Sequence, residues 1–175
     1  MVLIFSTVLV GFISYYLFPA YFIYYHNHDA EKNILYSEIT LLNKEKEKVE
    51  LDNDKIIVLD FWTTSCGICF KKFPELEQIY QKFKLNKRVE IYTVNVPIKK
   101  DKFEKTIKIL DSIGYEFPKL YAQSANQVET NLKFNTYPHL IILKKGKIRY
   151  DGFLITENSS KKYNIENQIN KLLNE

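Results

Sequence analysis

Glycine, proline and cysteine are all scarce in this chain. Its 175 residues include only 5 glycines, 5 prolines and 2 cysteines. So little glycine and proline excludes a collagen-like or low-complexity chain. The 46% of hydrophobic and 26% of charged residues exclude a disordered one. The length allows one ordinary domain with an extension, but not two domains that each have a core of their own.

The chain also has little excess charge of either sign. Its 25 basic and 21 acidic residues leave a net charge of +4, and the lysines are spread along the chain among acidic residues. A protein that binds nucleic acid usually has a larger and more clustered basic excess. We therefore expect solvated surface lysines, and no nucleic acid as a partner.

The N-terminal region has no charged side chain at all: residues 1–27 contain no Asp, Glu, Lys or Arg. Residues 2–25 form an apolar run interrupted only by Ser, Thr, Gly, Pro and Tyr, and about 20 apolar residues suffice to cross a bilayer. A cleaved signal peptide is the alternative, but it would have a basic start and a shorter apolar core. We expect residues 1–28 to be an uncleaved transmembrane helix in the lipid bilayer, and residues 29–175 to form the soluble domain.

The remainder of the chain alternates between strand-like and helix-like segments. β-Branched and aromatic runs predict strands at 39–42, 56–62, 89–96, 119–123, 139–143 and 147–153. Apolar residues spaced by three and four predict helices at 70–83, 101–114, 124–132 and 165–173. Asp101 with Glu104, and Ser124 with Gln127, are the expected helix caps. A β-α-β beginning and a β-β-α ending predict an α/β sandwich with a mixed central sheet.

The two cysteines, Cys66 and Cys69, lie between the predicted strand 56–62 and the next helix. The N-terminus of a helix carries unpaired N–H groups and a partial positive charge, so it stabilises a thiolate and lowers the pKa of the first cysteine. The second cysteine is expected in the first turn and more enclosed. This asymmetry suits disulfide exchange, in which Cys66 attacks a partner disulfide and Cys69 resolves the mixed disulfide.

Other interpretations of the cysteine pair are weaker. A structural zinc site normally needs four ligands, and the three histidines offer no second pair at a suitable spacing. A thiol peroxidase would use Thr63 three residues before Cys66, but its motif has a proline where this chain has Leu59. Two inert buried cysteines, or a redox-inactive module that binds a client protein, are the remaining alternatives. No metal and no cofactor is expected, because the disulfide itself holds the electrons.

Residues 58–69, with the sequence VLDFWTTSCGIC, resemble the active-site strand and turn of the thioredoxin superfamily. The apolar N-terminus and the extra segment between Lys99 and Gln123 are more similar to its membrane-anchored TlpA/ResA-like members. The resemblance implies a thioredoxin-like three-layer sandwich with a mixed central β-sheet, preceded by one N-terminal transmembrane helix. It covers about residues 56–173.

The resemblance also implies roles for individual residues. Asp60 resembles the buried acid that handles the proton of the second thiol, although a strand-end carboxylate paired with a lysine is the alternative. Trp62 stands where the family keeps an aromatic residue beside the site, where it would either contact a substrate or belong to the core. Pro74 stands where the active-site helix is kinked. Tyr137 and Pro138 resemble the loop whose cis-proline aligns a substrate chain. His139 is expected to be structural.

Taken together, these features predict a membrane-anchored thiol-disulfide oxidoreductase that acts as a reductase. By resemblance, its domain would lie in an extracytoplasmic, periplasmic space. Its expected partners are a disulfide-containing or dithiol protein substrate and a membrane electron donor or thiol partner. Reduction is thus the direction that we expect, but the residues themselves do not decide between reduction, oxidation and isomerisation of disulfides.

Overall fold

The computed structural model of the chain describes residues 39–156 and 164–175. The expected membrane anchor at residues 1–28 lies outside this described part. Within residues 39–156 and 164–175, no helix is both long and apolar enough to span a bilayer.

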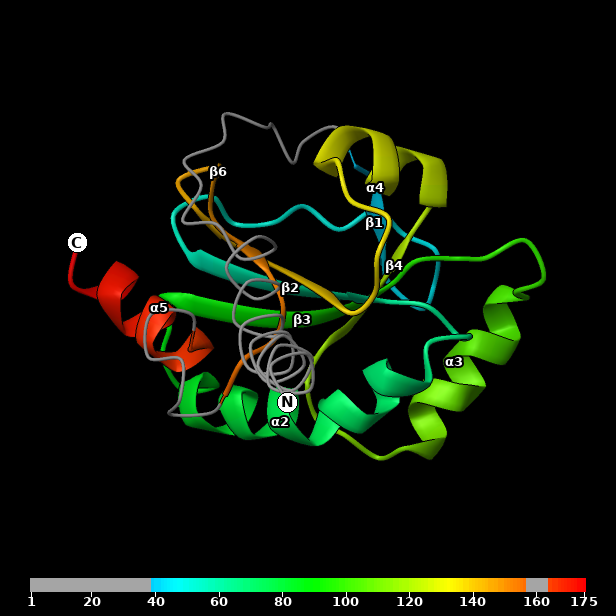
Figure 1. Cartoon of the computed structure of the whole chain (residues 1–175), viewed down its shortest axis with the longest axis horizontal. Helices are drawn as coiled ribbons and strands as arrows, with labels where there is room; N and C mark the ends of the chain where they lie inside the picture. The colour runs from blue at the N-terminus through cyan, green and yellow to red at the C-terminus, as the bar shows by residue number, and fades with distance from the viewer. Residues whose placement is uncertain (1–38, 157–163) are drawn as a thin grey trace, which may run out of the picture.

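A central β-sheet and the helices on its two faces make up the described part of the chain (Figure 1). Its strands lie in the order β1-β4-β3-β2-β5-β6. The strands are β1 (Leu41–Leu42), β2 (Ile56–Trp62), β3 (Val89–Asn95), β4 (Lys119–Ala122), β5 (His139–Lys144) and β6 (Lys147–Gly152). The helices are α2 (Gly67–Phe83), α3 (Phe103–Ser112), α4 (Ala125–Leu132) and α5 (Ile165–Leu173).

The sheet is mixed, as predicted from the order of elements. β2, β3 and β4 run parallel to one another, whereas β5 is antiparallel to β2, β6 to β5, and β1 to β4. Figure 1 shows α2, α3 and α5 on one side of the sheet and α4 on the other. All seven residues of β2 are buried, because helices cover both faces of this central strand. The continuous apolar run that predicted β2 follows from this double burial.

Alternate residues of β2 contribute to two different cores. Ile56, Val58 and Trp62 pack with residues of α2 and α5, whereas Ile57, Leu59 and Phe61 pack with residues of α4. This is the alternation that a pleated strand imposes on successive side chains. It assigns every other position of β2, Asp60 included, to the face that α2 covers.

Helix α2 packs on this face through one apolar stripe. Its buried positions recur at intervals of three and four residues, as an amphipathic helix requires. Near the middle of the stripe, the Phe73 ring meets the rings of Trp62 and Phe117 edge to face, at centroid distances of 5.4 and 5.5 Å. The stripe consists of Cys69, Phe73, Leu76, Ile79 and Phe83.

The predicted capping box of α3 is wrong. The N-cap of this helix is Lys102, which makes no side-chain capping hydrogen bond. The Asp101 carboxylate instead accepts hydrogen bonds from the Thr64 hydroxyl at 2.5 Å and from the Ile98 N–H at 3.1 Å. Asp101 therefore ties the start of α3 to the loop before the cysteines rather than capping the helix. Ser124 is the N-cap of α4 but likewise makes no side-chain capping bond.

We expect Phe73→Ala to lower the free energy of unfolding by about 3–5 kcal/mol, the usual cost of removing a fully buried phenylalanine. Leu85→Ala is the matched control: Leu85 is 89% exposed, so its truncation should cost less than about 0.5 kcal/mol. Urea unfolding of the full-length chain measures both. Equal effects of the two substitutions would contradict the packing of α2 described above.

Candidate functional site

Cys66 and Cys69 form a disulfide at the start of α2, with their Cα atoms 5.3 Å apart. Cys66 is the N-cap of the helix, and its sulfur accepts a hydrogen bond from the Cys69 N–H at 3.2 Å. Cys66 is partly exposed, whereas Cys69 is 1% exposed and lies in the buried stripe of α2. The predicted asymmetry of the pair is therefore present: one sulfur is accessible and carries a helix N–H bond, and the other is enclosed.

The two residues between the cysteines face solvent. Ile68 is 51% exposed, and a Cβ added at Gly67 would have no neighbour within 4 Å. Neither residue is thus needed to fill the core. The accessible edge of the site consists of this turn and the partly exposed Cys66.

Asp60 lies in the middle of β2, opposite Thr93 of β3 and Leu140 of β5. Its side chain is 1% exposed, and alternation with Val58 and Trp62 places it on the face covered by α2. Burial raises the pKa of Asp60 from 3.8 to about 8. An acid with a pKa close to neutral pH can both take up and release a proton, which suits a general acid–base.

The alternative in which Asp60 pairs with a lysine does not hold. Burial is the one cause of its raised pKa. Its Oδ1 atom has no hydrogen-bond partner among the residues that the structure describes. A buried carboxyl group with no partner is costly to ionise, so Asp60 is held as a neutral acid below about pH 8.

Trp62, for which both a substrate contact and a place in the core were expected, is fully buried. Its ring has 0% exposure and meets Phe70 and Phe73 edge to face, at centroid distances of 5.3 and 5.4 Å. An indole without exposed surface has nothing to offer a substrate in this conformation. Trp62 instead supports the first turns of α2, which carry the cysteines.

Tyr137 and Pro138 are joined by a cis peptide bond, as the resemblance implied. Pro138 is buried and Tyr137 is half-buried. His139 opens β5 opposite Phe61 near the end of β2. Because β5 runs antiparallel to β2, the loop that ends in Pro138 and the loop that leads to Cys66 emerge at the same end of the sheet. Tyr137 and Cys66 pack against the same core cluster. That Tyr137 and Pro138 contact a substrate stays a prediction.

Pro74 lies inside α2, where the resemblance placed it. His139, which was expected to be structural, is buried next to Pro138. Its Nε2 atom is 2.6 Å from Asp151 Oδ1 on β6, and its ring stacks on Phe134 at 3.8 Å. This arrangement holds the start of β5 in place. It indicates a structural role for His139, which supports the loop that ends in Pro138.

Two buried polar residues near the site, Asp151 and Asn95, were not singled out from the sequence. Asp151 becomes the partner of His139 only through the hairpin of β5 and β6. Asn95 closes β3 opposite Trp62, and its Nδ2 atom has no partner among the described residues. For Asn95 the available signal was its position in the alternation of β3, where it falls on the same face as the buried Val89 and Ile91.

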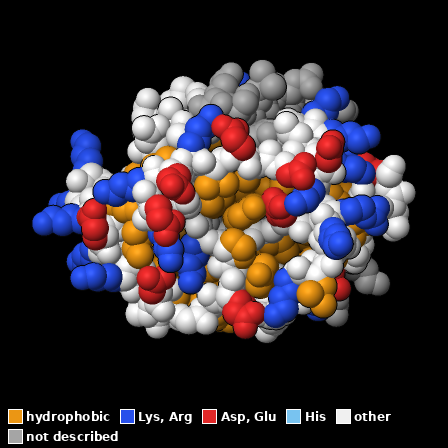
Figure 2. All heavy atoms as spheres, turned by 180° about the vertical axis from the view of Figure 1, so that it is seen from behind, with side chains coloured by type: hydrophobic (Ala, Val, Ile, Leu, Met, Phe, Trp, Pro, Cys, Tyr) orange, Lys and Arg blue, Asp and Glu red, His pale blue; other side chains and the backbone are white. Residues whose placement is uncertain are grey.

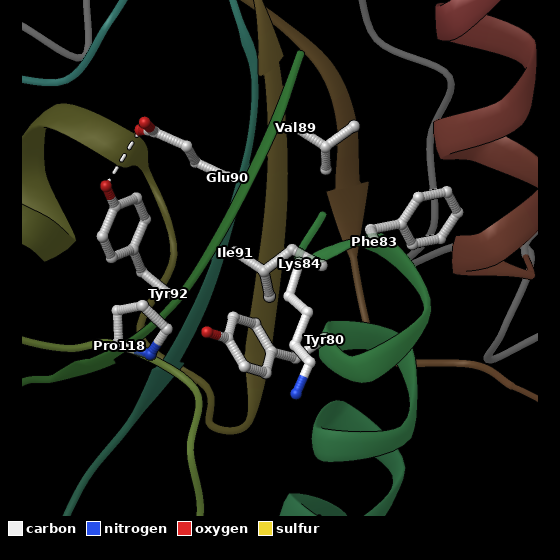
Figure 3. Close-up of a pocket in the computed structure, with 8 residues that line it drawn as sticks. All are labelled: Tyr80, Phe83, Lys84, Val89, Glu90, Ile91, Tyr92 and Pro118. Atoms are coloured by element: carbon white, nitrogen blue, oxygen red, sulfur yellow. Dashed lines mark hydrogen bonds between the residues drawn. The ribbon is translucent and has the colours of Figure 1, made fainter. Parts of the chain in front are cut away.

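A pocket of about 210 Å³ lies away from the cysteines, at the opposite end of α2 (Figure 3). The charged groups on its wall already have partners: Lys84 pairs with Glu116, and Glu90 with Lys55 and the Tyr92 hydroxyl.

On the face of the molecule turned away from the viewer in Figure 1, hydrophobic side chains gather near the middle with charged ones around them (Figure 2). In the part of the chain that the structure describes, no group of three His, Cys, Asp or Glu residues could hold a metal ion.

Comparison with known proteins agrees with this geometry. A family described as thioredoxin-like matches residues 53–148. A crystal structure from Bacteroides vulgatus, of a protein assigned as a thiol-disulfide oxidoreductase, matches with a TM-score of 0.63 at 18% identity, covering 75% of this chain and 89% of that one. A thiol:disulfide interchange protein from Bacteroides sp. matches with a TM-score of 0.57 at 25% identity, covering 71% and 84%. StoA from Bacillus subtilis matches with a TM-score of 0.51 at 18% identity, covering 65% and 87%. No curated protein sequence matches significantly.

The raised pKa of Asp60 makes folding stability depend on pH. Between pH 4 and 8 the folded chain holds a proton on Asp60 that the unfolded chain has released, so this group's contribution to stability falls as the pH rises through that window. Asp60→Asn cannot ionise and removes this dependence. We therefore expect the stability of the variant relative to the unsubstituted chain to rise from pH 5 to 8, by about 1.4 kcal/mol per pH unit at most, and to level off above pH 8. Urea unfolding at each pH measures the difference, and parallel curves for the two chains would refute the assignment.

Proposed function

The chain belongs to the thioredoxin-like family, and on that basis we propose that it is a thiol-disulfide oxidoreductase that exchanges disulfides with protein substrates. The observation that carries this proposal is the Cys66–Cys69 disulfide at the N-terminus of α2, with one accessible and one enclosed sulfur. The family match supports a redox role for the pair, and a neighbour at 25% identity, from Bacteroides sp., is itself a thiol:disulfide interchange protein.

The proposed reaction begins with the reduced pair. The Cys66 thiolate attacks a disulfide of the client protein, and one client sulfur leaves as a thiolate that takes up a proton. Cys69 then loses its proton to the Asp60 carboxylate and attacks the Cys66 sulfur. The second client sulfur leaves, and the Cys66–Cys69 disulfide forms. Two electrons have passed from the cysteine pair to the client, and no cofactor takes part.

The finer parts of the proposal concern place and direction. We propose that residues 1–28 anchor the chain in a membrane, that the domain faces an extracytoplasmic, periplasmic space, and that it acts there as a reductase. The uncharged apolar run at the N-terminus supports the anchor. A membrane electron donor or thiol partner would then reduce the disulfide again. Tyr137 and Pro138 would form the edge along which the client chain lies.

Single cysteine substitutions separate the two thiols by role. Cys66→Ser removes the attacking sulfur and should reduce turnover of insulin disulfides to the background rate. Cys69→Ser leaves the attack intact but cannot resolve the product, so it should accumulate a mixed disulfide with the substrate on a non-reducing gel. Trapping through Cys69 in the Cys66→Ser variant would reverse these roles.

The same variants test the rival functions. If Cys66→Ser keeps the protein's biological function intact, the redox-inactive client-binding module becomes the better account. Rapid consumption of hydrogen peroxide by the reduced chain would favour a thiol peroxidase instead.

The direction of exchange follows from the reduction potential of the Cys66–Cys69 couple, measured at equilibrium in glutathione or dithiothreitol buffers. For a reductase we expect a value near the thioredoxin end of the scale, about −270 mV. A value near about −120 mV would make the protein an oxidant of folding proteins. Failure to form a reversible disulfide would end the enzymatic proposal.

A further inference from the structure

Four buried side chains form a polar patch beside the cysteines. The register of the parallel strands β2 and β3 sets Asp60 opposite Thr93 and Trp62 opposite Asn95. All four lie on the face that α2 covers, because they alternate with Val58 of β2 and Ile91 of β3, which pack in the core beneath this helix. All four are also buried, Asn95 being 3% exposed.

Three atoms of this patch lack a hydrogen-bond partner among the described residues: Asp60 Oδ1, Trp62 Nε1 and Asn95 Nδ2. The first is an acceptor and the other two are donors. The Thr93 hydroxyl already donates to the Asp60 carbonyl oxygen at 3.5 Å. The patch thus holds two unused donors beside one unused acceptor, and leaving such groups unpaired in a core is costly.

Little else in the described structure can stabilise an ionised Asp60. α2 presents Cys69 and Phe73 to this face, β5 presents Leu140 opposite Asp60, and β3 presents Thr93 and Asn95. The one titratable group among these is Cys69, once it is reduced. Burial is the cause of the raised pKa of Asp60. Within residues 39–156 and 164–175, the amide of Asn95 and the indole of Trp62 are the buried side-chain donors of this patch that have no partner.

We propose that Asn95 is a positioning residue for Asp60: once Asp60 ionises, the side-chain amide of Asn95 and the indole of Trp62, which are unpaired in this structure, donate hydrogen bonds to its carboxylate. The two residues are diagonal neighbours on paired strands, roughly 8 Å apart at Cα, a span that two side chains bridge directly or through one water. These hydrogen bonds lower the cost of ionising Asp60, whose carboxylate is the minor form below about pH 8 and is the form that accepts the proton of Cys69. This inference rests on the proposed function, because it assigns the stabilising partners of the same proton acceptor.

The proposal makes a prediction about titration. Removing a donor withdraws support from the ionised form, so the pKa of Asp60 should rise further. With a pKa near 8 in the unsubstituted chain, a rise of about one unit would lower the ionised fraction at pH 7 roughly tenfold. The step in which Cys69 resolves the mixed disulfide should slow by the same factor at pH 7 and recover at high pH.

The test is Asn95→Leu in the full-length reduced chain, which removes the amide but keeps the branching and the number of side-chain heavy atoms. The pKa of Asp60 is read from the carboxyl carbon by NMR, and the rate of resolution is followed from pH 6 to 10 with an insulin substrate. Asn95→Gln keeps the amide, so the pKa of Asp60 should rise less in this variant than in Asn95→Leu. Thr106→Val, which removes a buried hydroxyl on α3, is the matched control and should leave the pH profile in place.

A shift of the Asp60 titration and of the rate profile by about one unit in Asn95→Leu supports the proposal. An unchanged pKa, or a rate lowered equally at every pH, overturns it and leaves Asn95 as a packing residue. If Asn95→Leu does not fold, Asn95→Ala and Trp62→Phe each remove a donor and decide in the same way. If the unsubstituted chain exchanges no disulfide, the proposed function fails and the role of Asn95 in it fails too, whatever the titration shows.

Discussion

The packing of α2 against β2 is the constraint on which the site depends. β2 is buried on both faces, and α2 covers one of them through a single apolar stripe. The first residue of that stripe is Cys69, and the helix begins one position after Cys66. The enclosed sulfur and the accessible sulfur are therefore consequences of one packing arrangement. If the helix were rotated by a quarter turn, Cys69 would be exposed and the two thiols would no longer differ in exposure.

The same arrangement explains why the interior next to the cysteines is polar. Because β2 alternates faces, Asp60 and Trp62 must lie beneath α2 once Val58 does. The parallel pairing of β3 then sets Thr93 and Asn95 beside them. Apolar residues at these positions would pack without unpaired atoms, so the chain retains polar groups where they lower stability. Sacrificing stability at one place in the core is typical of functional sites.

Much of the fold could be predicted from the sequence, because the strongest signals come from burial itself. Burial on both faces produced the continuous run at 56–62, and burial on one side produced the three-and-four spacing along α2. The pairing of distant strands left no such trace. Nothing local indicates that Asn95 faces Trp62, or that Asp151 meets His139, since both contacts depend on sheet register. The predicted capping box of α3 is wrong for a related reason: the Asp101 carboxylate accepts a hydrogen bond from Thr64, 37 residues away in the chain, instead of capping its own helix.

The candidate site joins two loops that the sequence keeps far apart. Antiparallel pairing of β5 with β2 sets His139 opposite Phe61, so the residue after Pro138 lies beside the residue before Trp62. The Cys66 loop thus depends on α2, and the Pro138 loop depends on β5 and on the His139–Asp151 pair. α2 packs on β2 and β5 pairs with β2, so a change in the packing of β2 would move the Cys66 sulfur and the expected client edge together. Disulfide exchange requires the attacking sulfur to approach the client disulfide in line. The central strand meets this requirement because it fixes the positions of the two loops relative to each other.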